Sequence, residues 1–286
     1  MILVKKMFVA RRRFLKLDLQ FQLFNSFNTK VLDQDDVMKI LELDTAKLNN
    51  PQINDCLQVT WLGHATYLVQ FVMETKSNSV INVLFDPVFS DIIGPIQKLG
   101  SRRYRESPVK NVSQLPRIDV VCISHDHYDH LDVTSIRDLH RVFPDIKWCV
   151  PARTDEWLSS TLDKPDVVAL SWWEDTTLDL SCITTSPTEN VDNEKLSLSV
   201  EFVPAQHWCL RGLTTGSWYR PKSDENYRLW GGWVLKTVPG SGTSSARSVY
   251  HAGDTGYCDI FKTIGERHDG FDLSMIPIGA YTPRFV

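Results

Sequence analysis

The sequence predicts one α/β domain that contains many strands and fewer helices. Short runs of β-branched and aromatic residues recur along most of the chain between turn-forming residues. The 286 residues, 42% of them hydrophobic and 23% charged, are typical of a soluble globular protein and exclude a disordered or collagen-like chain. No run approaches the roughly 20 consecutive apolar residues of a membrane span. The chain contains neither an internal repeat nor a linker that would divide it.

Residues 1–55 differ in composition from the rest and are interpreted as an N-terminal extension. Six bases and no acid occur among the first sixteen residues, interleaved with apolar side chains. Because the whole chain carries a net charge of −4, the remainder carries −10. The basic and apolar segment could lie on an anionic membrane surface, and a disordered leader fits the same pattern. Apolar residues at helical spacing predict a helix over residues 33–48.

From residue 57 onward the expected elements follow one another in regular order. Strands are predicted where β-branched and aromatic residues dominate between turn formers. A helix is predicted over residues 133–143, with Asp132 or Thr134 available as its N-cap. Polar residues predict surface loops over residues 184–195 and 239–245. The predicted strands cover residues 57–63, 65–72, 80–85, 118–123, 146–150, 167–170, 196–203, 233–238, 248–251 and 273–278.

The six cysteines are scattered and form no Cys-x-x-Cys pair. A secreted disulfide scaffold would be shorter and denser in cysteine, so reduced thiols in an intracellular protein are expected. Cys122 and Cys149 lie inside apolar runs, which predicts that both are buried.

The strongest local signal begins at Ser124 and reads Ser-His-Asp-His-Tyr-Asp-His-Leu-Asp, directly after a predicted apolar strand. Its three imidazoles and three carboxylates would be costly to bury without partners. A divalent metal resolves this cost, because neutral imidazole and carboxylate are standard zinc ligands. His125 and His127 can reach one ion together, while Asp129 and His130 on the next turn can reach a second. The spacing therefore predicts two metals.

The remaining ligands of a two-metal site must come from other strand ends. His207 follows the strand predicted over residues 196–203, and Asp254 follows the one over residues 248–251. Gly253 and Gly256 flank Asp254, which would let the backbone turn tightly and direct the carboxylate between two ions. The expected ligands are therefore His125, His127, Asp129, His130, His207 and Asp254.

The His-x-His-x-Asp-His string with the later histidine and aspartate resembles the metallo-β-lactamase superfamily. More narrowly, five blocks in the same order resemble the N-acylphosphatidylethanolamine-hydrolysing phospholipase D family, from about residue 57 to the end. The other four blocks are Trp-Leu-Gly-His-Ala-Thr from Trp61, Ala-Gln-His-Trp-Cys from Ala205, Ala-Gly-Asp-Thr-Gly-Tyr-Cys from Ala252, and Ile-Pro-Ile-Gly-Ala-Tyr-Thr-Pro-Arg from Ile276.

The resemblance implies an αββα sandwich over residues 56–286, with two zinc ions between the upper edges of its sheets. It implies that one zinc is held by His125, His127 and His207. Asp129 and His130 would hold the other zinc, and Asp254 would bridge both. Asp129 and Asp254 would be the catalytic carboxylates, and Tyr128 would face the substrate.

The C-terminal end departs from the family pattern. In that family a further histidine beyond the last block completes the second zinc site, whereas here no histidine follows His268. We therefore expect a truncated chain that lacks the last strand and its helices and binds the second zinc more weakly. His268 is expected in a polar loop, and His251 and His140 are expected to be structural. His64 matches a family motif but not a zinc position, so it is expected at most to contact the zinc ligands and not to bind zinc itself.

The resemblance predicts a zinc-dependent phosphodiesterase that hydrolyses N-acylphosphatidylethanolamine to N-acylethanolamine and phosphatidic acid. The expected substrate is a phospholipid. The protein is expected inside the cell at a peripheral membrane surface, with a cytoplasmic location as the alternative. A homodimer is left open. Nucleic acid is excluded as a partner, because the body is acidic and has no basic stripe. Two other functions remain open: an inactive truncated isoform that binds metal or membrane, and a soluble metallo-hydrolase of small esters or lactones.

Overall fold

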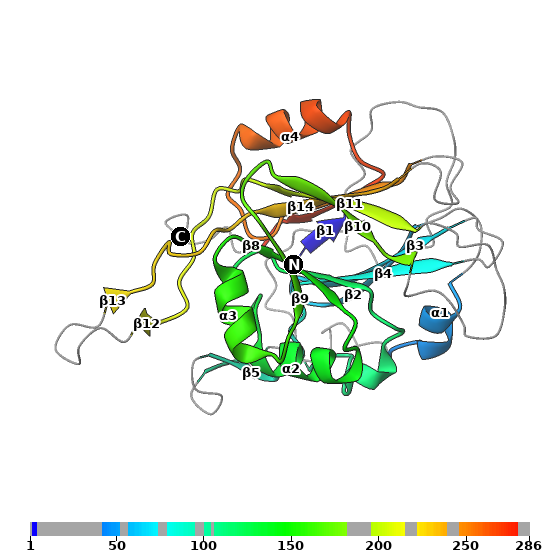
Figure 1. Cartoon of the computed structure of the whole chain (residues 1–286), viewed down its shortest axis with the longest axis horizontal. Coiled ribbons are helices and arrows are strands. Elements are labelled where there is room, and N and C mark those ends of the chain that lie inside the picture. Colours follow the sequence, from blue (N-terminus) through cyan, green and yellow to red (C-terminus); the bar gives the residue numbers. More distant parts are fainter. Residues whose placement is uncertain are drawn as a thin grey trace, which may run out of the picture.

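Two six-stranded sheets lie face to face between outer layers of helices in the computed structural model of the chain (Figure 1). Helix α4 covers one sheet, and α2 and α3 cover the other. The αββα sandwich expected from the motifs is therefore confirmed. The described residues are 2–4, 42–51, 57–73, 79–94, 100–103, 106–181, 196–214, 222–238 and 246–279.

The first sheet has the strand order β2-β3-β4-β7-β8-β9, antiparallel from β2 to β4 and parallel from β4 to β9. Because β4, β7 and β8 run in parallel, their carboxyl ends meet at one edge, where the metal loop begins. The strands are β2 (Leu57–Gly63), β3 (Thr66–Val72), β4 (Val80–Phe85), β7 (Val120–Cys122), β8 (Lys147–Pro151) and β9 (Asp166–Leu170).

The second sheet has the order β1-β16-β15-β14-β11-β10 and is antiparallel except where β15 pairs with β16. Its strands are β1 (Ile2–Val4), β10 (Asp175–Asp179), β11 (Ser197–Val203), β14 (Gly232–Thr237), β15 (Ser248–His251) and β16 (Leu273–Pro277). The short pairs are β5 (Ile92–Ile93) with β6 (Ser101–Arg102), and β12 (Leu213–Thr214) with β13 (Lys222–Ser223). The helices are α1 (Thr45–Asn49), α2 (Val133–Val142), α3 (Thr154–Thr161), α4 (Ile260–His268) and the 3-10 helix Val112–Gln114.

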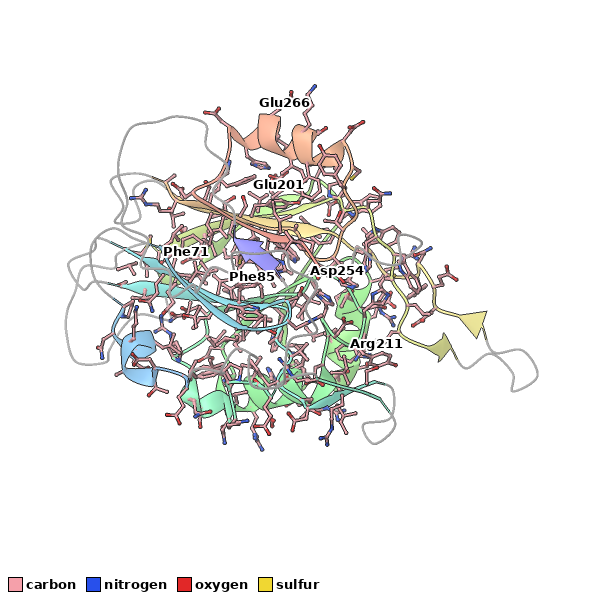
Figure 2. The ribbon with its side chains drawn as sticks, turned by 180° about the vertical axis from the view of Figure 1, so that it is seen from behind. Phe71, Phe85, Glu201, Arg211, Asp254 and Glu266 are labelled. Atoms are coloured by element: carbon pink, nitrogen blue, oxygen red, sulfur yellow. The ribbon has the colours of Figure 1, made fainter. Side chains whose placement is uncertain are left out.

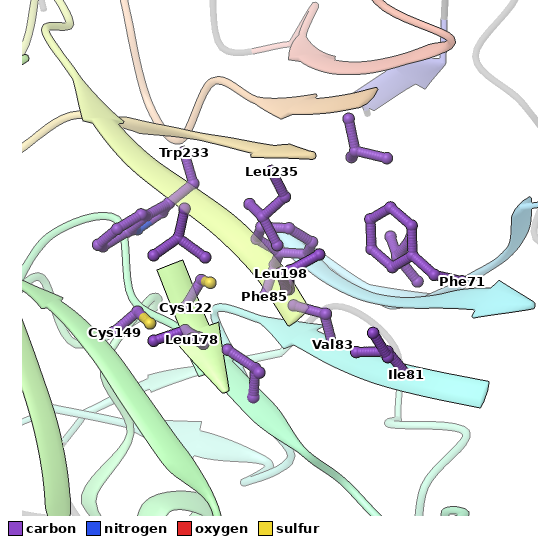
Figure 3. Close-up of a cluster of buried hydrophobic side chains, with 14 of the residues drawn as sticks. Phe71, Ile81, Val83, Phe85, Cys122, Cys149, Leu178, Leu198, Trp233 and Leu235 are labelled. Carbon is purple, nitrogen blue, oxygen red and sulfur yellow. The ribbon is translucent and has the colours of Figure 1, made fainter. Parts of the chain in front are cut away.

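The main core fills the space between the two sheets. Phe85 from the first sheet and Leu198 and Trp233 from the second belong to one buried cluster (Figure 3). Cys122 and Cys149 belong to the same cluster, as predicted. The indole Nε1 of Trp233 donates to the carbonyl of Ile123 at 2.8 Å, which ties the second sheet to the strand that precedes the metal loop.

Separate apolar layers attach the helices to the outer faces of the sheets. Ile136 and Leu139 of α2 pack with Trp148 of the first sheet, and Ile264 of α4 packs with Tyr250 of the second. Every residue of β3 is buried, because this strand has the core on one side and the helical layer on the other.

The N-terminal helix expected over residues 33–48 is confirmed over residues 45–48 and wrong over residues 42–44, and its earlier part lies outside the described residues. Residues 42–44 are not helical, and α1 begins only at Thr45, where Asp44 accepts a hydrogen bond from the backbone nitrogen of Lys47 at 2.9 Å. Leu48 is buried in the apolar layer beneath the first sheet, so this part of the extension packs onto the domain. The short strand β1 pairs with β16 at the edge of the second sheet.

Several other expectations differ from the structure. His268 was expected in a polar loop, but it is the last residue of α4, with its side chain buried next to Glu201. The sequence pattern also missed β10, α3 and α4. For the helix expected over residues 133–143, the structure has α2, and Asp132 is its cap. The loops expected over residues 184–195 and 239–245 lie outside the described residues.

The described cysteines Cys122, Cys149, Cys209 and Cys258 are all free, in agreement with the expected reduced thiols. Cys56 and Cys182 lie outside the described residues. In the described part of the chain, none of the helices has the length and apolar character needed to cross a bilayer.

Candidate metal centre

The metal loop connects β7 to α2 and is fixed at both ends. At its start, the backbone nitrogen of Ser124 donates to the buried carboxylate of Asp86 at 2.7 Å. At its end, Asp132 caps α2 by accepting from the backbone nitrogen of Ser135 at 3.3 Å, and it also accepts from the hydroxyl of Ser90 at 2.7 Å. The histidines between these anchors are therefore held on a loop with little freedom.

Three imidazoles converge at one point of the centre. Nε2 of His125 lies 2.9 Å from Nδ1 of His127, and Nε2 of His207 lies 3.2 Å from each of these nitrogens. Nitrogens bound to one tetrahedral zinc at about 2.0–2.1 Å lie about 3.3 Å apart. The spacing of the three nitrogens therefore matches ligands that share one ion.

His207 and Asp254 reach the loop from the second sheet. His207 follows β11, Asp254 follows β15, and the two segments are joined by a bridge between Gln206 and Gly256. Gly253 has φ 61°, and a Cβ on it would lie 2.7 Å from the side chain of Ser124. A glycine is therefore needed for the backbone before Asp254 to turn and lie against the metal loop. Figure 2 shows Asp254 at one end of the sandwich.

A second group of possible ligands lies beside the first. Nε2 of His130 is 3.2 Å from Oδ2 of Asp254 and 3.8 Å from Oδ2 of Asp129. The ligand atoms of His125, His130 and Asp254 lie within 4.8 Å of one another, as do those of His64, Asp129 and His130. Asp254 thus lies close to both halves of the centre. The structure brings all six expected ligand side chains together.

The donor atoms fit a metal ion. In the described part of the chain, Nε2 of His130 is buried and makes no hydrogen bond of standard geometry, although it faces two carboxylates. A buried polar atom without a partner is costly, and an ion between imidazole and carboxylate would satisfy it. The side chains of Asp129 and Asp254 are both 36% exposed, so the centre is open to solvent on this side.

The electrostatics differ between the two halves. Burial lowers the pKa of His207 to about 4, although the carboxylate of Asp254 opposes this shift. Burial also lowers the pKa of His125 and of His127. His130 behaves in the opposite way: burial would lower its pKa, but the carboxylates of Asp254 and Asp86 raise it well above its usual range. The three-histidine half is therefore deprotonated at neutral pH, whereas a proton competes for His130.

Sequence reasoning missed Asp86, which directs His130 toward the centre. Asp86 is fully buried at the end of β4, and its Oδ2 lies 2.8 Å from Nδ1 of His130. A carboxylate on one ring nitrogen places the proton there and leaves Nε2 free to bind a metal. The sequence does contain a signal for Asp86, because this carboxylate directly follows the apolar strand predicted over residues 80–85. The same kind of signal identified His207 and Asp254.

A buried cationic network supports the loop from the other side. Arg228 pairs with Asp126 at 3.0 Å and with Asp224 at 2.9 Å. The guanidinium of Arg211 lies 4.6 Å from the ring centre of Tyr128, whose hydroxyl donates to the carbonyl of Arg211. Tyr128, which was expected to face the substrate, is thus held against Arg211, and its role toward a substrate stays a prediction.

Two pairs of aromatic residues, Trp172 with Trp173 and Trp218 with Tyr219, are candidates for lipid contacts, and Trp172 and Trp173 lie in different environments. Trp172 is 37% exposed, and its Nε1 donates to the carbonyl of Trp230 at 2.6 Å. Trp173 is partly buried beside the apolar layer under α4. Trp218 and Tyr219 lie outside the described residues.

The family model described as "Beta-lactamase superfamily domain" matches residues 81–286, so the chain belongs to the beta-lactamase superfamily. Within it, the chain is 37% identical over 234 residues to N-acyl-phosphatidylethanolamine-hydrolyzing phospholipase D 1 of Caenorhabditis elegans, covering 80% of this chain and 55% of the relative. It is 31% identical over 259 residues to the mitochondrial N-acyl-phosphatidylethanolamine-hydrolyzing phospholipase D of Saccharomyces cerevisiae, covering 90% of this chain and 46% of the relative. The resemblance predicted from the five blocks is therefore confirmed.

The chain spans about half the length of these two relatives. Among solved structures, isothiocyanate hydrolase from Delia radicum gut bacteria aligns with a TM-score of 0.43 and 16% identity, over 74% of this chain and 68% of that chain.

Proposed function

We propose that the chain is a phosphodiesterase of the phospholipase D type, which uses two zinc ions to hydrolyse N-acylphosphatidylethanolamine to N-acylethanolamine and phosphatidic acid. The observation that carries this proposal is the convergence of His125, His127 and His207 within 3.2 Å of one another, directly beside a carboxylate-rich second group. The similarity to relatives named for this reaction supports the substrate class.

Zinc is the proposed metal because the donors are imidazole nitrogens and carboxylate oxygens. His125, His127 and His207 would hold one ion, Asp129 and His130 the other, and Asp254 would lie between them. A pair of such ions, when bound, supplies a hydroxide near neutral pH and neutralises charge on phosphoryl oxygens.

The residues of the chain contribute orientation and access. Asp86 keeps Nε2 of His130 directed at the carboxylates, and the part-exposed side chains of Asp129 and Asp254 can be reached from solvent. Asp126 is fully buried and pairs with Arg228, so it is not available to carry a proton to solvent. Its contribution is to hold the loop between His125 and His127 in place.

Exposed aromatic side chains next to the centre favour a lipid over a small soluble ester. Trp208 is 40% exposed, and its ring centre lies 4.8 Å from that of His127. Tyr257, three residues after Asp254, is 93% exposed. Aromatic rings with a polar end suit the boundary between water and lipid. We therefore propose that this side of the centre meets a membrane surface, with N-acylphosphatidylethanolamine entering from the bilayer.

Turnover of vesicles that contain N-acylphosphatidylethanolamine tests the function. Release of phosphatidic acid should disappear with a chelator, return with zinc, and be lost in His207→Ala. His140→Gln is the matched control, because His140 lies on α2 and its Nε2 is 2.8 Å from the carbonyl of Asp163, away from the centre. Co-sedimentation with vesicles without turnover would favour a binding module. Turnover of small esters or lactones alone would favour a soluble hydrolase.

A further inference from the structure

The turn between β2 and β3 brings a second imidazole to the half of the centre that contains Asp129 and His130. Nε2 of His64 lies 2.9 Å from Oδ2 of Asp129, across 65 residues of sequence. Its ring centre is 5.3 Å from that of His130, with the rings edge to face. The ligand atoms of these three residues lie within 4.8 Å of one another.

We propose that His64 is a direct ligand of the metal ion held by Asp129 and His130. This inference rests on the proposed two-metal centre, but it concerns a residue that the ligand set expected from the sequence leaves out. With His64 included, the second ion has two imidazoles and two carboxylates, since Asp254 lies 3.2 Å from His130. Four such ligands are the number that zinc most often takes in closed sites.

The backbone holds His64 in a conformation that side chains rarely adopt. His64 has φ 47°, and the preceding Gly63 has φ 104°. A non-glycine residue held in the left-handed region is strained, and such residues concentrate at functional sites. The carbonyl of His64 accepts from Nε1 of Trp61 at 2.9 Å, which fixes the turn. A Cβ on Gly63 would lie 2.7 Å from the guanidinium of Arg103, so the turn packs tightly there.

The exposure of His64 fits a ligand that can adjust. Its side chain is 50% exposed, whereas His130 is fully buried. Adjacent ligand atoms on one zinc lie about 3.3 Å apart when the bonds are about 2.0–2.1 Å. The distance from His64 to Asp129 already meets this spacing, and rotation of a half-exposed ring can bring its nitrogen closer to that of His130.

A hydrogen bond that only orients Asp129 would give the same contact, so the test must detect a bond to the metal. The protein is labelled with nitrogen-15 histidine and loaded with cadmium-113 in place of zinc. A direct bond splits the Nε2 resonance of His64 by coupling to cadmium, and a hydrogen bond to Asp129 does not. His64→Asn identifies the resonance, and asparagine is one of the residues that tolerate φ above zero.

Metal titration provides a second measurement. His64→Asn should raise the Kd of the second ion by about 100-fold. Loss of a residue that only hydrogen-bonds a metal ligand typically raises the Kd by about 10–100-fold, so the expected effect lies at the top of that range. It should leave the first ion unchanged, and His140→Gln should change neither. Two bound cadmium ions without splitting at His64 would overturn the His64 inference alone. Failure to bind an ion at His125, His127 and His207 would overturn the proposed function as well.

Discussion

Replacing Asp86 by asparagine tests whether this buried carboxylate prepares His130 to bind metal. Oδ1 of Asp86 accepts from the backbone nitrogen of Ser124 at 2.7 Å, so the amide oxygen of asparagine must take that position. The amide NH₂ then replaces Oδ2, which now lies 2.6 Å from Oγ of Ser124 and 2.8 Å from Nδ1 of His130. With a donor there, His130 must carry its proton on Nε2, the nitrogen that faces Asp254.

The expected magnitudes follow from these contacts. The two hydrogen bonds to a buried charge are worth about 1.5–3 kcal/mol each and are replaced by bonds to a neutral amide worth about 0.5–1.5 kcal/mol each, so Asp86→Asn should lower the free energy of unfolding by about 2–3 kcal/mol. The wrong ring tautomer should raise the Kd of the second zinc by about 10–100-fold. Urea unfolding measures the first quantity, and calorimetric titration of metal-free protein with zinc measures the second.

Asp119 offers a matched control at the opposite end of β7. It is 2% exposed and accepts from the backbone nitrogen of Asn82 and from Nε of Arg117, both at 2.7 Å. Asp119→Asn should therefore reduce stability while both zinc affinities stay unchanged. A folded Asp86→Asn variant that binds the second zinc with the wild-type Kd would show that Asp86 does not prepare His130 to bind metal.

Three further predictions concern pH, the cationic network and the core. Because the pKa of His207 is lowered to about 4 and that of His130 is raised, acidification from pH 8 should release the second ion first and retain the first until the pH approaches 4. Metal analysis after dialysis at each pH measures this order, and simultaneous release would contradict it. Arg228→Met removes the buried ion pairs with Asp126 and Asp224, leaves the Asp126 carboxylate without its partner, and should cost about 3–5 kcal/mol of unfolding free energy. As a control, Arg141→Met removes an exposed ion pair and should cost less than about 1 kcal/mol of unfolding free energy. If urea unfolding gave the same loss of free energy for both variants, the Arg228 ion pairs would not be buried as described. Leu198→Ala, in the core between the sheets, should cost about 2–5 kcal/mol, and a thermal midpoint equal to that of the wild type would show that this core position is not packed as described.

The strands could be predicted from sequence because burial on the pleated faces selects β-branched and aromatic residues. Edge strand β10 escaped this pattern: Asp175–Asp179 contains two acids and two threonines, and only Leu178 is buried. Helices α3 and α4 are short, and each buries few apolar residues, so their periodicity is weak. The predicted N-terminal helix included residues 42–44, which are not helical, because helical spacing continued ahead of Asp44, whose side chain caps α1.

The candidate site was predictable where its residues are local or follow strong strands. The metal loop lies within nine residues, and His207 and Asp254 follow shortly after apolar strands. Asp86 and His64 were not placed at the centre, because their contacts depend on which strands pair. Parallel pairing of β4 with β7 brings Asp86 to Ser124, and the hairpin of β2 and β3 brings His64 to Asp129. Side-chain periodicity reports the buried face of a strand but not its neighbours.

Anomalous diffraction from zinc-loaded crystals, measured on both sides of the zinc absorption edge, tests the two-metal centre most directly. A two-metal centre at these residues predicts two peaks. One should lie about 2.0–2.1 Å from Nε2 of His125, Nδ1 of His127 and Nε2 of His207. The other should contact Asp129 and His130, with Asp254 adjacent to both. A map with zinc absent from these side chains, or bound only elsewhere on the surface, would show that they do not form a zinc centre.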